Sequence, residues 1–206
     1  MRFYGQGNPP LDQFLYENYF RNVKNGTFIE CGAFDGVMES SCKFFEESMG
    51  WTGINVEADP HAFNLLEKNR PESHNVKAAL SNKLGSAMFT HVIHPKRGHH
   101  FGNGSIRHTG AHRKLLEALK CQFTEIRVGL ITYGDLLRMV PIDRLDLFVL
   151  DVEGHELQVL EGMRGVKVLP RVFCIEHKHA DVDETTESLG YRLDKRDDNN
   201  SFYIKI

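Results

Sequence analysis

Apolar residues along this chain alternate between short uninterrupted runs and helical spacing. The most informative run, Leu-Phe-Val-Leu at 147–150, predicts a buried parallel strand, because such strands are covered on both faces. It leads into an acidic stretch, Asp-Val-Glu-Gly-His-Glu at 151–156, and then into helical spacing from Leu157 to Met163. Ligands of open α/β sheets bind beyond the carboxyl ends of the strands, so residues 151–156 form a candidate site.

The rest of the chain continues this alternation. Strands are predicted at 27–31, 53–57, 75–80, 124–130, 145–150, 171–176, 191–196 and 201–206. Helices are predicted at 11–24, 40–49, 59–70, 111–120, 133–139, 154–163 and 183–189. The last two strands form a hairpin across residues 197–200. This order predicts a three-layer α/β/α fold around a doubly wound, mostly parallel sheet with a C-terminal antiparallel hairpin.

Length and composition indicate one ordinary globular domain over residues 1–206, opened by a helical segment at 1–25. The chain is 41% hydrophobic and 26% charged, and its net charge of -3 argues against broad nucleic-acid or membrane-surface binding. No apolar run approaches the ~20 residues that a membrane helix needs, and the first residues lack the apolar core of a signal peptide. We therefore expect a cytoplasmic protein.

The cysteines and histidines change this picture little. The four cysteines are far apart and form no CxxC pair, so we expect small buried hydrophobic residues in a reducing compartment. Eleven histidines is a high count, but their spacing is not that of a closed metal-binding shell.

The turn after the first strand indicates the cofactor. It reads Glu30-x-Gly32-x-x-x-Gly36 instead of G-x-G-x-x-G. A pyrophosphate binds at backbone N–H groups and a helix N-terminus, and an acidic side chain there would repel it. The same acidic residue suits a cofactor with a cationic end, such as S-adenosylmethionine (SAM). Glu57, at the tip of the second strand, is placed to accept hydrogen bonds from two ribose hydroxyls. Together these features favour SAM over NAD.

Several segments are similar to one known family. They are residues 28–36, the Glu-x-Asp-Pro tip at 57–60, Ala-Leu-Ser-Asn at 79–82, the D-x-E-G-x-E segment at 150–162, and the shorter matches at 4–6 and 200–203. The chain thus resembles the FkbM family of SAM-dependent methyltransferases over nearly its whole length. Two departures are Phe34, where the family often has Asn, and His155, where it often has a small residue.

This resemblance implies a class I methyltransferase fold with a seven-stranded sheet, and methyl transfer to a hydroxyl oxygen. It implies that Glu30, Gly32 and Gly36 lie near the methionine end of SAM, Glu57 at the ribose, and Ala79 with Leu80 near the adenine. Ala33, Ala58 and Asp151 complete the expected set of cofactor-binding residues.

Asp151 is the first catalytic candidate. Its alternative role is to cap the following helix, with Glu153 and Glu156 complementing the helix dipole. O-methylation requires a hydroxyl to lose its proton during attack, and a carboxylate or imidazole within hydrogen-bond reach can take that proton. His155, next to this cluster, is a further candidate.

The strand predicted at 171–176 ends in Glu176 and leads into His177, beside the strand that leads into Asp151. We expect these three side chains to converge. They could hold Mg²⁺ or another divalent cation, or leave His177 free as the base. The alternative is a pair that forms only local hydrogen bonds.

Residues 94–114 form a loop and the start of a helix with five basic residues, five histidines and no acidic residue. The ordinary interpretation is a solvated loop. Because long loops in compact domains are usually functional or mobile, the second interpretation is a segment that binds an anionic acceptor.

The sequence as a whole predicts a SAM-dependent O-methyltransferase acting on a sugar, glycan or related small molecule. A catalytically idle binding module with the same fold is an alternative, although intact Glu30, Glu57 and Asp151 speak against it. An RNA methyltransferase is another, but a wider basic face would be expected for nucleic acid. A NAD-dependent dehydrogenase is the least favoured.

Overall fold

A seven-stranded sheet organises the part of the chain that the structure describes, residues 1–177, 179–197 and 199–206 in this computed structural model. Its spatial order is β3-β2-β1-β7-β8-β10-β9, and β10 alone runs antiparallel to the other strands of this sheet. The bounds are β1 (Thr27–Cys31), β2 (Thr52–Glu57), β3 (His74–Lys77), β7 (Leu147–Leu150), β8 (Val172–Glu176), β9 (Tyr191–Arg196) and β10 (Asn200–Lys205). Lys178 and Asp198, the latter in the predicted hairpin turn, lie outside the described residues.

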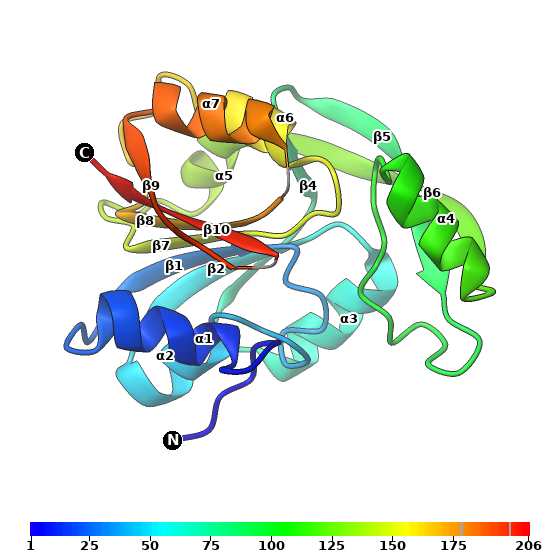
Figure 1. Ribbon diagram of the computed structural model, residues 1–206, viewed down its shortest axis with the longest axis horizontal. Helices are drawn as coiled ribbons and strands as arrows, with labels where there is room; N and C mark the ends of the chain where they lie inside the picture. Colours follow the sequence, from blue (N-terminus) through cyan, green and yellow to red (C-terminus); the bar gives the residue numbers. More distant parts are fainter. Residues whose placement is uncertain (178, 198) are drawn as a thin grey trace.

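Helices cover both faces of this sheet (Figure 1). One face carries α1 (Leu11–Leu15), its π-helical continuation η1 (Tyr16–Phe20), α2 (Lys43–Met49) and α3 (Pro60–Asn69); the other carries α5 (Tyr133–Met139), α6 (Glu156–Glu161) and α7 (Ala180–Ser188). Successive strand residues point to opposite faces, so β1 contributes to both cores. Phe28 packs with Phe20 and Phe45, whereas Ile29 packs with Leu160 and Tyr133 on the other side.

A second sheet of order β4-β6-β5 extends to one side, with α4 (Gly110–Ala118) against it (Figure 1). Its strands are β4 (Ala79–Ser81), β5 (Gly85–Ile93) and β6 (Gln122–Thr132). β5 and β6 pair antiparallel over nine residue pairs, and this long ribbon frames the segment at 94–114. Leu116 of α4 packs on Val92 of β5 and so fixes the helix to the ribbon.

The predicted three-layer fold, with its mostly parallel seven-stranded sheet and C-terminal antiparallel hairpin, is confirmed. Three details of the prediction are wrong. Residues 75–80 form two strands in different sheets, the helix predicted at 11–24 changes to π-helical hydrogen bonding after Leu15, and β5 had no counterpart in the prediction. β5 lies at an edge of its sheet, where an exposed Met88 interrupts the apolar pattern.

Two negative findings accompany this fold. Throughout the described ranges, the helices are too short or too polar to cross a bilayer. All four cysteines are buried and free, as their isolated positions predicted.

The strand order reverses between β1 and β7, because the chain leaves β1 toward β2 and β3 and later returns to the other side of β1. Cys31 and Leu150 pair at the carboxyl ends of these strands. Beyond them, Gly32 has φ of +88°, and a Cβ on it would lie 1.7 Å from the carbonyl oxygen of Asp151. Only glycine allows the two strand ends to approach this closely.

We therefore expect Gly32→Ala to lower the free energy of unfolding by about 3 kcal/mol, since it combines overpacking with a strained φ. Chemical denaturation measures this change. Gly129→Ala is the control, because nothing lies within 4 Å of a Cβ at that position in β6. Equal stabilities of the two variants would show that the strand ends can separate at little cost.

Candidate functional site

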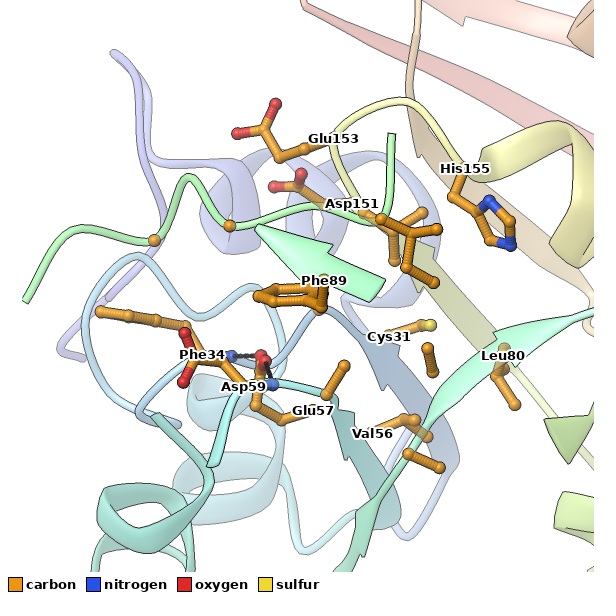
Figure 2. Close-up of a pocket in the computed structure, with 18 of the residues that line it drawn as sticks. Cys31, Phe34, Val56, Glu57, Asp59, Leu80, Phe89, Asp151, Glu153 and His155 are labelled. Carbon is orange, nitrogen blue, oxygen red and sulfur yellow. Dashed lines mark hydrogen bonds between the residues drawn. The ribbon is translucent and has the colours of Figure 1, made fainter. Parts of the chain in front are cut away.

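A cavity opens where β1, β2 and β7 end, at the reversal of the strand order. It encloses about 670 Å³, including the part open to solvent. Its walls come from four segments: 31–34, 56–59, 78–80 and 151–155, together with Phe89 and the loop at 101–106. Figure 2 shows Asp151 and Glu153 on one side of Phe89, and Glu57 with Asp59 on the other. The cavity therefore has acidic groups at two separate places.

Glu57, the last residue of β2, is buried in the cavity wall. Its Oε2 accepts a hydrogen bond of 2.8 Å from the backbone N–H of Phe34, and its Oε1 accepts one of 2.7 Å from that of Asp59 (Figure 2). A carboxylate has about four lone-pair sites, so two of them remain free. Burial raises the pKa of Glu57 to about 7, although both backbone hydrogen bonds oppose this shift.

The wall beside Glu57 is largely apolar. Val56, Ala79 and Leu80 form its floor, and Phe89 of β5 covers them. Phe101, Gly102, Gly104 and Ile106 close the cavity from the loop side. The backbone of Ser105 exchanges two hydrogen bonds with Thr90, and its buried hydroxyl donates to the Glu153 carbonyl at 2.8 Å, so this loop is fixed against the acidic segment.

Asp151 and Glu176 meet at the acidic end of the site, with their carboxyl groups within hydrogen-bonding reach. The side chain of Asp151 is exposed to solvent, and the cavity wall around it partly desolvates its carboxyl group. This desolvation, followed by the charges of Glu176 and Glu153, raises the pKa of Asp151 well above its ordinary range. Two adjacent carboxyl groups cannot both ionise cheaply, so the pair holds one proton to higher pH than an isolated carboxyl would.

His112 in α4 also belongs to this end of the site, and the sequence analysis did not single it out. Its Nδ1 lies 3.1 Å from Glu153 Oε2, and its Nε2 lies 3.0 Å from Asn103 Oδ1. Both ring nitrogens thus face acceptors, and the bond to Glu153 raises the pKa of His112. The only signal in the sequence was the high number of histidines at 94–114.

His155 also lines the cavity (Figure 2). Its Nε2 lies 3.1 Å from the hydroxyl of Ser81. Burial, and then the nearby Arg107, lowers the pKa of His155, so its imidazole is neutral at pH 7. The cation of Arg107 is therefore close enough to influence a residue of the cavity wall.

Glu30 does not face the cavity, contrary to its expected place near a cofactor. Its carboxylate accepts hydrogen bonds from the Ser40 hydroxyl at 2.8 Å and the Ser41 N–H at 2.6 Å, and the Arg70 guanidinium lies 3.7 Å away. The physical reason is strand alternation: Cys31 lines the cavity, so its neighbour Glu30 points to the opposite face.

Ala33 and Gly36 also lie outside the cavity wall as the structure describes it. Ala33 packs with Phe63 and Leu66, and a Cβ on Gly36 would meet Leu66 and Arg70. Gly32, Glu57, Ala58, Ala79, Leu80 and Asp151, by contrast, all line it.

His177 does not join Asp151 and Glu176. Its Nε2 lies 2.6 Å from the hydroxyl of Tyr203, and Asp183 is its other neighbour. The expected magnesium site of Asp151, Glu176 and His177 is therefore not assembled, because adjacent residues at a strand end point to opposite sides. The residues do not fit that ion. Among the described residues, the one group of three with the spacing of metal ligands is His61, His91 and His99.

A seven-stranded sheet with an antiparallel β10 and a cavity at the reversal of strand order defines a class I methyltransferase fold. The family model of the Methyltransferase FkbM domain matches residues 30–193. The chain belongs to the FkbM methyltransferase family, as its sequence motifs predicted.

Solved structures agree on the fold. The FkbM methyltransferase of Methylobacillus flagellatus is 14% identical with a TM-score of 0.54, and the match covers 90% of this chain and 46% of that one. Fibrillarin of Aeropyrum pernix, crystallised with natively bound SAM, is 8% identical with a TM-score of 0.55, covering 97% of this chain and 74% of that one.

The chain thus spans about half of the first of these structures. No curated protein shows significant sequence similarity to it.

The raised pKa of Glu57 gives a testable pH dependence. The folded protein holds this proton up to about pH 7, whereas the ordinary glutamate value is 4.5, so folding is progressively weakened as pH rises between these values. We expect the wild type to lose about 2–3 kcal/mol more free energy of unfolding between pH 4.5 and 8 than Glu57→Gln. Urea denaturation across this pH range measures both slopes. Parallel slopes would mean that Glu57 is ionised throughout.

Proposed function

We propose that this protein is a SAM-dependent methyltransferase that methylates a hydroxyl oxygen. The observation that carries the proposal is one cavity with two differently placed acidic groups: Glu57 with free lone pairs at the end of β2, and Asp151 just after β7, next to Glu176 at the end of β8. The first suits ribose hydroxyls and the second a positive charge. Membership of the FkbM family supports the same assignment.

The residues present fit SAM. Glu57 has the acceptor capacity for two ribose hydroxyls, and Ala79, Leu80 and Phe89 offer an apolar surface for the adenine. Gly32 and Asp151 would hold the methionine end, and Ala58 would border the ribose. When bound, SAM supplies a methyl group activated by its sulfonium charge. Glu30 would act without contacting SAM. It accepts hydrogen bonds from Ser40 and Ser41 and so fixes the turn that follows Gly32.

Asp151 is the proposed base for the acceptor hydroxyl. A carboxylate whose pKa lies above the ordinary range accepts a proton more readily near neutral pH, and desolvation raises the pKa of Asp151 in this direction. Glu176, in hydrogen-bonding reach, would share that proton. His155 is less suited, because its Nε2 already shares a hydrogen bond with Ser81.

The acceptor would approach from the side of residues 94–114. Exposed Arg107, and His112, whose pKa is raised by its hydrogen bond to Glu153, place basic groups on this side next to the Asp151–Glu176 pair. We therefore propose an acceptor that carries a hydroxyl together with an anionic group, on a glycan or related small molecule. Mass spectrometry of neutral and anionic acceptors incubated with protein and SAM tests this class directly, through the added mass of a methyl group.

The cofactor assignment predicts that calorimetry will detect one SAM site in the wild type. Glu57→Ala should weaken this binding at least about tenfold, because two hydrogen bonds to a charged acceptor are lost. Glu67→Ala, an exposed glutamate on α3, should leave it unchanged. If the wild type binds no SAM, the chain is an idle member of its fold and the proposal fails.

The assignment of the base predicts that Asp151→Asn will lower kcat by about 10²–10⁴, since the amide keeps the shape but cannot take a proton. Asp143→Asn, at an exposed position before β7, is the matched control and should keep full activity. A fall of less than about tenfold in Asp151→Asn would leave Asp151 with a structural role only.

A further inference from the structure

Three histidines from separate parts of the chain meet beside the cavity. His61 lies in the first turn of α3, His91 in β5, and His99 in the loop that follows β5. One nitrogen from each ring lies within 4.8 Å of the other two. The rings of His61 and His91 both face that of His99 in near-parallel stacks, with centroids 4.8 and 5.0 Å away.

Asp59 holds two of these residues in place. Its side chain accepts a hydrogen bond from Nδ1 of buried His91, which leaves Nε2 of that ring directed at His99. Its other oxygen accepts the backbone N–H of His61 at 2.8 Å and so caps α3. A carboxylate on the far nitrogen of an imidazole is the usual companion of a metal-bound histidine, because it fixes the tautomer and the ring orientation.

We propose that His61, His91 and His99 bind one divalent transition-metal ion of the zinc class. Three imidazoles without a carboxylate suit Zn²⁺, Co²⁺ or Ni²⁺, and do not suit Mg²⁺ or Ca²⁺, which require oxygen ligands. His61 and His99 are exposed, so an ion has access and a water molecule can take the fourth position.

Binding of such an ion requires two adjustments. The ring nitrogens lie within 4.8 Å of one another, so exposed His61 must turn inward by up to about 1.5 Å. His91 Nε2 and His99 Nδ1 are 2.7 Å apart, and ligands of a tetrahedral ion at about 2.0–2.1 Å lie roughly 3.3 Å apart. His99 belongs to an exposed loop, so it can move by the few tenths of an ångström that separate these values.

A metal at this place would tie the loop to α3 and β5. Phe101 and Gly102, two and three residues after His99, form part of the cavity wall. The ion would therefore hold that wall closed, at a distance from the Asp151–Glu176 pair. The three histidines would thus shape the cavity, although they would not contact the reacting atoms.

The test is Zn²⁺ titration of tag-free, chelator-treated protein by calorimetry, with Co²⁺ absorption as a spectroscopic reporter of tetrahedral coordination. We expect one site in the wild type. His61→Ala, His91→Ala and His99→Ala should each weaken it at least about 100-fold, and Asp59→Asn, which retains a cap for α3, about 10–100-fold. His100→Ala, an exposed histidine next to His99, should bind like the wild type.

A second measurement follows the loop itself. Trypsin cleaves after Lys96 and Arg97, both exposed, and Zn²⁺ should slow this cleavage in the wild type and His100→Ala but not in His99→Ala. Both measurements need neither SAM nor acceptor, so their outcome is independent of methyl transfer. The proposal fails if the wild type binds no stoichiometric Zn²⁺, or if His99→Ala and His100→Ala behave alike; the histidines then form only a hydrogen-bonded stack.

Discussion

The close approach of β1 and β7 at their carboxyl ends is the constraint on which the rest of the site depends. Because Gly32 has no side chain, the Asp151 carbonyl can lie where a Cβ would otherwise be. The backbone after β1 and the acidic segment after β7 then share one cavity. The ends of β2 and β4 complete it, with Glu57 on one side and Leu80 on the other. If the ends of β1 and β7 lay further apart, the residues that follow them would not line one cavity.

A buried ion pair, formed by Arg70 and Glu30, stabilises the turn that follows β1. Arg70, at the end of α3, lies 3.7 Å from Glu30, also bonds Glu46, and donates to the Gly36 carbonyl at 3.1 Å. Taking both charges out of water is costly, and removing one partner of such a pair typically costs about 3–5 kcal/mol. The pair therefore connects α3 to the turn after Gly32 and gives the acidic residue of this motif a role in positioning that turn.

Much of this was accessible from the sequence, because apolar runs and helical spacing located strands whose ends meet at one edge. Gly32, Glu57 and Asp151 were found in this way. The alternation of side chains along a strand could also have separated Glu30 from Cys31, and Glu176 from His177, since neighbours point to opposite faces. The FkbM motifs carried no information about that orientation. The strand β5 was missed because its exposed Met88 obscures the alternation of its side chains.

The histidines could not have been assigned from sequence spacing at all. His61 is separated from β5 by the rest of α3 and by two strands, and His91 lies next to the start of α3 through its contact with Asp59. Likewise, His112 reaches Glu153 only because α4 packs on the same ribbon. Long-range contacts of this kind depend on the three-dimensional path of the chain, which local periodicity does not encode.

Electrostatic coupling connects two parts of the proposed reaction, the binding of SAM and the deprotonation of the acceptor hydroxyl. Desolvation and the charges of neighbouring carboxylates raise the pKa values of Asp151 and Glu176, and so favour their protonated forms. A cation held beside Asp151 would favour the ionised carboxylate and lower its pKa. Under the proposed function, Asp151 would thus be ionised, and able to accept a proton, only when SAM is bound. Ionisation of Asp151 would in turn strengthen SAM binding by an equal free energy, because linkage between a proton and a ligand is reciprocal.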